Sequence, residues 1–124
     1  MKSKPKAMFI GRYQTVHEGH KYLFRQKINE GVPVLICIRD MQKDDKNPYS
    51  PQEVISLFKS DAECVNWIQN GEMEFIVIPD IVGVYYGRDV GYAVEKIEVP
   101  DEIASISATK LRQQNMTEAI NGKL

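Results

Sequence analysis

Three short apolar runs alternate with longer amphipathic or polar segments, and this order limits the fold more than any other feature of the chain. The runs cover residues 7–10, 32–38 and 73–79. The second run consists almost wholly of apolar and β-branched residues, which is typical of a strand buried on both faces. Strands that alternate with helices favour a parallel sheet. We therefore expect an α/β fold in which helices cover both faces of a parallel sheet.

The two segments between these runs are expected to contain helices. Residues 19–30 carry apolar side chains at helical spacing, and Gly31 follows as a typical helix stop. Ser50, followed by a proline and by Glu53 three positions later, is typical of an N-cap with a capping box. A second helix is therefore predicted from there to about Asn70.

Beyond the third run the sequence has three further candidate elements. A fourth apolar run covers residues 81–86, and residues 94–99 alternate as an edge strand does. Residues 107–114 are predicted to start a last helix. In parallel sheets, ligands bind beyond the carboxyl ends of the strands, at the point where strand order reverses. The first strand-to-helix turn is therefore the place to look for chemistry.

Length and charge limit the classes of protein to consider. The 124 residues match the size of one domain, with flexible tails expected at residues 1–6 and about 115–124. The 16 basic and 17 acidic residues give a net charge of −1, without the basic excess of a protein that coats nucleic acid. No apolar run approaches the roughly 20 residues of a membrane helix. We expect neither nucleic acid nor membrane as a partner.

The cysteines indicate a compartment. Cys37 and Cys64 lie far apart within apolar patterns, and their spacing does not fit a zinc site. The N-terminal residues lack the apolar stretch of a secretory signal. We therefore expect reduced thiols in the core of a cytoplasmic protein, and no metal site built from protein side chains.

Both histidines of the chain lie three residues apart in the turn after the first run, GRYQTVHEGH. A helix that begins near the second glycine of this turn places His17 just before its first turn and His20 within it. The free N–H groups and partial positive charge at that end attract phosphate. Gly11 allows a tight turn, Gly19 lets a ligand approach the backbone, and Arg12 adds a donor. A lone loop histidine is more often structural, but two in this setting favour a phosphate site.

The turn resembles the GRxQxxHxGH signature of the nucleotidyltransferase superfamily, which includes nicotinamide-nucleotide and phosphopantetheine adenylyltransferases and the small cytidylyltransferases. Residues 47–53, NPYSPQE, resemble a segment that precedes a helix in the nicotinamide-nucleotide branch. Residues 106–112, ISATKLR, resemble the ISxTxxR motif near the C-terminus of these proteins. The three segments follow the expected order and span nearly the whole chain. The resemblance implies one nucleotidyltransferase domain over residues 1–124, with a Rossmann-like parallel sheet and helices on both faces.

The resemblance also implies a reaction. A phosphate-bearing acceptor, such as nicotinamide mononucleotide, attacks the α-phosphorus of a nucleoside triphosphate, with ATP favoured, and pyrophosphate leaves. His17, His20 and Arg112 are the expected catalytic residues, and Mg²⁺ is the expected cofactor, carried mainly by the substrate phosphates. The residues expected to contact the nucleotide are Gly11, Arg12, Tyr13, Gln14, Gly19, Gly87, Arg88, Asp89, Ile106, Ser107 and Thr109.

The ISATKLR segment has the chemistry of a phosphate clamp. Ser107 is a typical N-cap, the first-turn N–H groups then face outward, and Thr109 adds a hydroxyl. Arg112 lies one turn further on, and its planar guanidinium binds two oxygens at once. Taken alone, the segment also fits an ordinary capped surface helix. For the turn around Gly87 and Asp89, a ligand contact and a purely structural turn are both open.

Some residues depart from the family pattern and leave alternatives open. Val54 stands where the nicotinamide-nucleotide branch has an arginine that helps to hold phosphate, so the acceptor is open, with Arg39 and Lys46 as candidates to replace that arginine. The short chain favours a small cytidylyltransferase of the glycerol-phosphate or phosphocholine type that uses CTP, whereas Gln14 replaces the aspartate of that group. A non-catalytic nucleotide-binding module is a further alternative, and a fragment similar to class I aminoacyl-tRNA synthetases is another. The tyrosines between residues 85 and 92 leave a homo-oligomer open.

Overall fold

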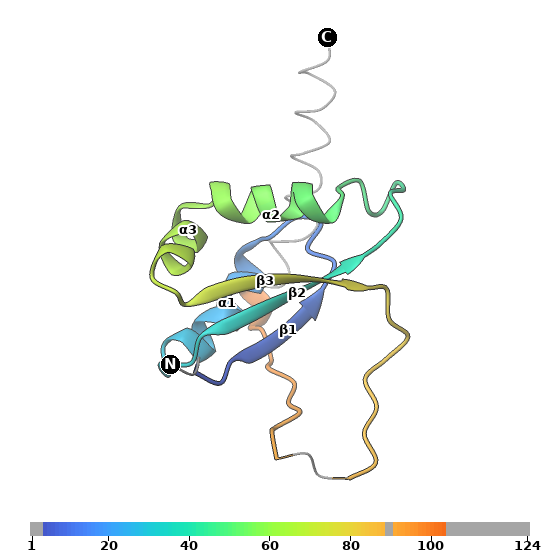
Figure 1. Cartoon of the computed structure of the whole chain (residues 1–124). Helices are drawn as coiled ribbons and strands as arrows, with labels where there is room; N and C mark the ends of the chain where they lie inside the picture. The colour runs from blue at the N-terminus through green and yellow to red at the C-terminus, as the bar shows by residue number, and fades with distance from the viewer. Residues whose placement is uncertain (1–3, 89–90, 104–124) are drawn as a thin grey trace.

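The computed structural model describes residues 4–88 and 91–103, and its elements follow the order predicted from the apolar runs (Figure 1). The helices and strands are β1 (Ala7–Gly11), α1 (Glu18–Ile28), β2 (Val34–Asp40), α2 (Pro51–Ser60), α3 (Ala62–Gln69) and β3 (Met73–Pro79). The first three predicted strands and the first predicted helix are confirmed, each with its ends within two residues of the prediction.

The three strands form one parallel sheet in the order β1-β2-β3. In its register, Phe9 of β1 lies opposite Ile36 of β2, which lies opposite Phe75 of β3. The predicted α/β fold with a parallel sheet is therefore confirmed. The central place of β2 explains why its sequence is an almost unbroken apolar run, since a central parallel strand has neighbours on both sides.

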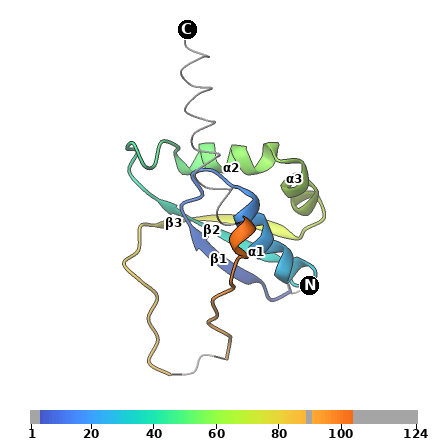
Figure 2. The same cartoon turned by 180° about the vertical axis from the view of Figure 1, so that it is seen from behind.

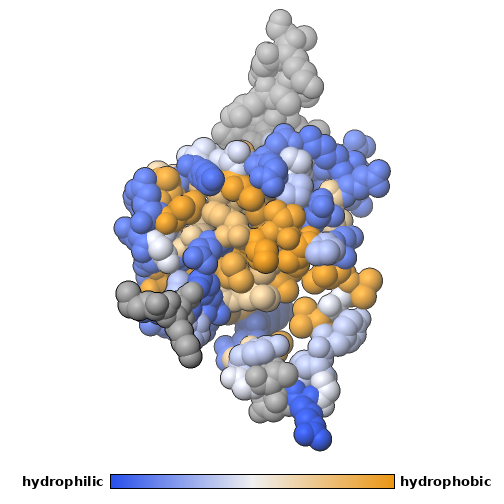
Figure 3. All heavy atoms as spheres, viewed as in Figure 1, coloured by the Kyte–Doolittle hydropathy of each residue, from blue (hydrophilic) through white to orange (hydrophobic). Residues whose placement is uncertain are grey.

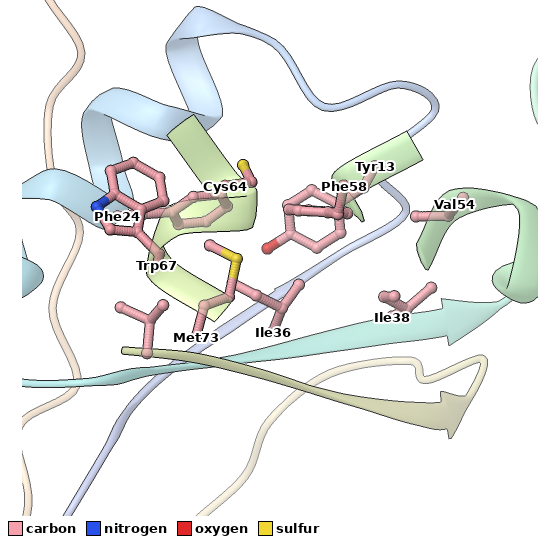
Figure 4. Packing of buried hydrophobic residues seen from close by; sticks show 10 residues of the cluster. Tyr13, Phe24, Ile36, Ile38, Val54, Phe58, Cys64, Trp67 and Met73 are labelled. Atoms are coloured by element: carbon pink, nitrogen blue, oxygen red, sulfur yellow. The ribbon is translucent and has the colours of Figure 1, made fainter. Parts of the chain in front are cut away.

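All three helices pack on the same face of the sheet. Phe24 of α1, Phe58 of α2 and Trp67 of α3 meet in one core with Ile36 of β2 (Figure 4). The connections from β1 to β2 and from β2 to β3 run in the same direction across the sheet. Because such crossovers are right-handed, both place their helices on the same face. Figure 2 shows α1 on the near side of the sheet, in the view opposite to that of Figure 1.

The other face of the sheet carries apolar side chains without a covering helix among the described residues. Met8 and Ile10 of β1 and Ile76 of β3 point to this side and are 61%, 38% and 47% exposed. We call these three residues the open face, and Figure 3 shows apolar surface over the middle of the sheet there. The second layer of helices predicted from the sequence is not found within residues 4–88 and 91–103. Such a layer requires a strand order that reverses at β1.

The single helix predicted from Pro51 to about Asn70 is wrong, because Asp61 divides it into α2 and α3. The backbone of Asp61 is extended, and its side chain accepts hydrogen bonds from the amides of Glu63 and Cys64. Asp61 is thus both the C-cap of α2 and the N-cap of α3. Aspartate favours helix ends over helix interiors, since its short side chain competes for backbone N–H groups.

The strands predicted at residues 81–86 and 94–99 are wrong, because neither segment joins the sheet. Apolar side chains in the first segment are exposed, with Val82 at 96% and Tyr85 at 80%. A strand needs a neighbour with which to pair its backbone, and composition alone does not supply one. The helix predicted at residues 107–114 lies outside the described residues.

Cys37 and Cys64 are buried free thiols, which confirms the prediction that both lie in the core. Each has the role of a small apolar side chain there. None of the helices between residues 4 and 88 has the length and apolar character needed to cross a bilayer, and the same holds for residues 91–103.

Candidate functional site

The turn GRYQTVHEGH links β1 to α1, and its two histidines cap the helix. His17 is the N-cap, and its Nδ1 accepts a hydrogen bond from the amide of Gly19 at 3.1 Å. The amide of His17 donates in turn to Nδ1 of His20 at 3.2 Å. This capping box built from imidazoles fixes the start of α1 at Glu18, which confirms the predicted helix start. We call residues 11–20 the histidine turn.

The hydrogen bonds of the capping box also determine which nitrogen of each histidine ring carries the proton. A neutral imidazole has one acceptor nitrogen and one donor nitrogen. Since Nδ1 of His17 and Nδ1 of His20 both accept from backbone amides, the proton of each neutral ring lies on Nε2. The two rings stack with centroids 3.8 Å apart and an interplanar angle of 18°. The arrangement gives two stacked rings that each carry an Nε2–H donor.

His20 is neutral at pH 7. Burial, with a smaller contribution from His17, lowers the pKa of His20 from 6.5 to about 3. The rings of Tyr13 and Phe24 pack beside it, with centroids at 4.9 Å and 6.5 Å. A neutral imidazole still donates a hydrogen bond, so His20 is suited to bind a phosphoryl oxygen without adding a net charge to the site.

Lowering the pH from 8 to 5 is expected to reduce the free energy of unfolding by about 2 kcal/mol through His20. The pKa of His20 is lower in the folded protein than in the unfolded chain, so the unfolded chain takes up the proton first. This stabilisation is complete above the unfolded pKa of 6.5 and is lost as the pH falls toward the folded value of about 3. Urea unfolding at several pH values measures it. A His20→Asn variant should have a flatter pH profile, and equal profiles would contradict the assignment.

Tyr13, which the sequence assigns to the nucleotide, has its side chain in the core. The ring is 6% exposed and packs against Phe24 and Phe58. It also lies over Gly11, where an added Cβ would stand 3.0 Å from the ring. The left-handed backbone of the turn is at Tyr13, with a φ of 51°, and not at Gly11. Gly11 is therefore required by the close approach of a ring and not, as predicted, by a tight turn of its own backbone.

Two side chains of the histidine turn bind the NPYSPQE segment. Nε2 of Gln14 donates to the carbonyl of Tyr49, and Oε1 of Gln14 accepts from the amide of Tyr49, both at 2.9 Å. Nη1 of Arg12 donates to Oδ1 of Asn47 at 3.2 Å. Asn47 is buried, and its backbone and side-chain amides donate to Asp44. We call the two contacts between the segments the clasp, and it joins residues 35 positions apart.

Sequence reasoning misses Asn47 and Tyr49 as members of the site. The NPYSPQE resemblance marks the right stretch of chain, but a contact across 35 residues leaves no local pattern. The clasp also changes the interpretation of Gln14, whose amide supports the turn by pairing with a backbone peptide group. Arg12 remains exposed beside it.

Replacing Gln14 by Glu is expected to lower the free energy of unfolding by about 1–3 kcal/mol. The carboxylate would still accept from the amide of Tyr49, but it would place a second acceptor against the carbonyl of Tyr49. Chemical denaturation measures the change. Gln52→Glu, at an exposed position in the first turn of α2, is the matched control and should change stability by less than about 0.5 kcal/mol. Equal stability of the two variants would argue against the clasp.

The charged residues of α1 bind this helix to α3. Lys21 in the first turns of α1 pairs with Asp61 at 3.2 Å. Arg25 binds Glu63 through Nε and Nη2 and Glu18 through Nη1. These ion pairs hold the helix whose N-terminus carries the histidines against its neighbour in the same layer.

Several predicted site residues do not join the histidine turn. Gly87 and Arg88 are exposed, and the segment after β3 that holds them runs away from the carboxyl ends of the strands in both views (Figures 1 and 2). Asp89, Ile106, Ser107, Thr109 and Arg112 lie outside the described residues. The structure therefore brings together Gly11, Arg12, Tyr13, Gln14, His17, Gly19 and His20.

Comparison with protein-family models, with curated protein sequences and with solved structures gives no match. Within the described part of the chain, no group of three or more His, Cys, Asp or Glu side chains is placed to hold a metal ion. The histidine turn and the clasp, positioned by the sheet, are the features of the described residues that bear on function.

Proposed function

We propose that the protein is a nucleotidyltransferase, which moves a nucleoside monophosphate from a nucleoside triphosphate to a small phosphate-bearing acceptor and releases pyrophosphate. The observation that carries the proposal is the pair of stacked imidazoles, each with Nδ1 on a backbone amide and the proton on Nε2. The pair lies at the N-terminus of α1, just after the carboxyl end of β1. Phosphate binds at helix N-termini, and ligands of parallel sheets bind at this edge.

In the proposed reaction, an oxygen of the acceptor phosphate forms a bond to the α-phosphorus, and the bond from that phosphorus to the pyrophosphate oxygen breaks. Pyrophosphate leaves with the electron pair. His17 and His20 donate from Nε2 to the α- and β-phosphoryl oxygens, where charge spreads in the transition state. Both rings are held by the backbone, so they need little reorganisation during the reaction. The chain contributes positioning and hydrogen bonds, and no covalent intermediate is required.

Further donors complete the proposed site. Arg12 is exposed within the histidine turn, and we propose that its guanidinium, already fixed through Nη1 by Asn47, binds a phosphate with another nitrogen. Mg²⁺ enters as part of the Mg²⁺–triphosphate substrate, bound to phosphate oxygens and water. From the resemblance of ISATKLR, we propose that Ser107, Thr109 and Arg112 hold the leaving pyrophosphate.

A complete Rossmann-like sheet with helices on both faces is the structural part of the proposal. Among the described strands, β1 stands at an edge of the sheet. A strand added beside β1 would reverse the strand order and place its own helices over the open face. The exposed apolar side chains there support this arrangement. The substrate would then bind at the reversal point, next to the histidine turn.

The proposed donor is ATP, and the proposed acceptor is of the nicotinamide mononucleotide type, because the GRxQ and ISxTxxR resemblances point to that branch. Val54 is fully buried in the core, so this position supplies no cation to the acceptor. We propose that Arg12, which belongs to the histidine turn and is held by Asn47, replaces it. A small cytidylyltransferase that uses CTP is the alternative within the same chemistry.

The test is a matrix of the four nucleoside triphosphates against phosphate-bearing acceptors with Mg²⁺, scored by pyrophosphate release. The acceptors are nicotinamide mononucleotide, glycerol phosphate, phosphocholine, phosphopantetheine and a sugar phosphate. We expect release with ATP and one acceptor, and release that needs both. A folded protein that releases no pyrophosphate from any pair would contradict the proposal. Nucleotide binding without release would indicate a binding module instead, for which the histidines serve mainly as caps.

A further inference from the structure

Tyr13 combines an unfavourable backbone conformation with a buried side chain. Its φ of 51° lies in the left-handed region, which is disfavoured for residues that have a Cβ. Phe24 and Phe58 fill the same core from regular helices, without such a backbone. Filling space does not by itself call for this conformation, and strained residues of this kind cluster at sites that require a fixed geometry. The conformation therefore points to a second role.

The ring of Tyr13 supports His20 from the side of the core. The two centroids are 4.9 Å apart and the planes are inclined by 70°, which is an edge-to-face contact. On its other sides, the Tyr13 ring meets Phe58 at 5.4 Å and lies in contact with Gly11. Figure 4 shows Tyr13 and Phe58 together in the layer between the helices and the sheet. The ring is therefore itself held in place by the core on which His20 rests.

We propose that Tyr13 is a positioning residue for His20: it holds the imidazole plane so that Nδ1 stays on the amide of His17 and Nε2 carries the proton. Four contacts define the plane of His20, namely the stack on His17, the amide of His17, the edge of Tyr13 and the more distant ring of Phe24. The first two come from the turn itself. Tyr13 and Phe24 both tie the plane to the core, and Tyr13 is the nearer of the two, with its centroid at 4.9 Å against 6.5 Å. The Tyr13 ring packs on α1 and α2 at once.

This role belongs to the protein without ligand, so it does not depend on the proposed reaction. Only its effect on turnover rests on the proposed function. If Tyr13 fixes the ring, its removal should allow His20 to exchange between its two tautomers, even where the rest of the core stays folded. If Tyr13 only fills space, a core variant of similar size elsewhere should have the same effect.

The test is the tautomer of His20, observed by NMR at pH 7 in ligand-free protein labelled with ¹⁵N-histidine. We expect one protonated Nε2 and one acceptor Nδ1 in the original protein and in Tyr13→Phe, which keeps the ring. Tyr13→Leu should show both tautomers in exchange. Phe75→Leu is the matched control, since it removes a ring that packs on Phe58 from the sheet, and it should keep the original tautomer.

A folded Tyr13→Leu protein with the original tautomer would overturn the proposal, as would the loss of the tautomer in Phe75→Leu. If Tyr13→Leu does not fold, Gly11→Ala serves instead, because its Cβ would stand 3.0 Å from the Tyr13 ring and displace it. Partial loss of the tautomer is expected there. An unchanged tautomer with shifted Tyr13 ring resonances would count against the role.

Turnover separates this proposal from the proposed function. In Tyr13→Leu, kcat for pyrophosphate release should fall by roughly 10-fold to 100-fold with little change in KM, since the donor is misplaced and binding groups remain. Loss of the tautomer in a protein whose original form has no turnover would support the positioning role and contradict the function. Normal turnover together with a lost tautomer would contradict the use of His20 as an oriented donor.

Discussion

Replacing His20 by Ala, or His17 by Ala, is expected to lower the rate of pyrophosphate release by about 10²–10³ while the protein still folds. On the proposed mechanism, each change removes one Nε2–H donor aimed at charge that develops in the transition state, and the loss of one such donor typically has this effect. The donors are fixed by backbone amides in the folded protein, so their contribution is available without reorganisation. Steady-state kinetics with the substrate pair found in the matrix measures the change.

The two histidine positions allow catalysis to be separated from helix capping. His17→Asn retains a side-chain oxygen that can accept from the amide of Gly19, whereas His17→Ala removes the cap and should cost about 1 kcal/mol in unfolding free energy. We expect both variants to lose turnover to a similar extent, although only the alanine variant loses stability. Near-normal turnover of His17→Asn would show that His17 serves as a cap alone.

Replacing Phe58 by Ala is expected to lower the free energy of unfolding by about 3–5 kcal/mol. Phe58 is fully buried, and its ring contacts Tyr13, Phe24 and Phe75. It therefore joins the histidine turn, α1 and β3 to α2 in one cluster, and its removal leaves a cavity that these elements cannot all close. A loss of this size is a large share of the stability of a domain this small, so partial unfolding at 37 °C is expected. Thermal and urea unfolding followed by circular dichroism measure the loss.

Leu57 is the matched control on the same helix. It lies next to Phe58 in sequence but is only half-buried, so Leu57→Ala removes less apolar area from the core. We expect a loss of about 1 kcal/mol there. A similar loss at both positions would mean that the aromatic cluster is not the main source of stability.

The parts of the fold that are predictable from the sequence are those with local signals. Residues 73–79 form a strand as expected, because an apolar β-branched run between turn residues is a self-contained pattern. The start of α2 is also predictable, since Ser50 and Glu53 carry a capping box within the segment they begin. The start of α1 was predicted from the glycine-containing turn, but its capping by imidazoles was not, because histidine is not a usual N-cap. The break at Asp61 had a local signal too, but an acidic residue in an amphipathic pattern fits a helix surface equally well.

The parts that are not predictable depend on contacts between distant residues. Whether residues 81–86 become a strand depends on a neighbouring strand, which their own composition does not specify. The side of the sheet on which helices lie depends on strand order, and strand order leaves no trace in any one segment. In the candidate site, the turn and its histidines were accessible from the motif, whereas the pairing of Gln14 with Tyr49 was not.

The open face has a thermodynamic consequence for the whole molecule. Met8, Ile10 and Ile76 keep between 38% and 61% of their surface hydrated after the described strands and helices have formed, and this exposed part does not contribute to the free energy of folding at that stage. Any element or molecule that seats on them would release this water and bind only the folded sheet. Folding of the sheet and binding to the open face are then linked equilibria: binding raises the stability of the folded sheet, and a more stable sheet raises the apparent affinity for the bound element or molecule.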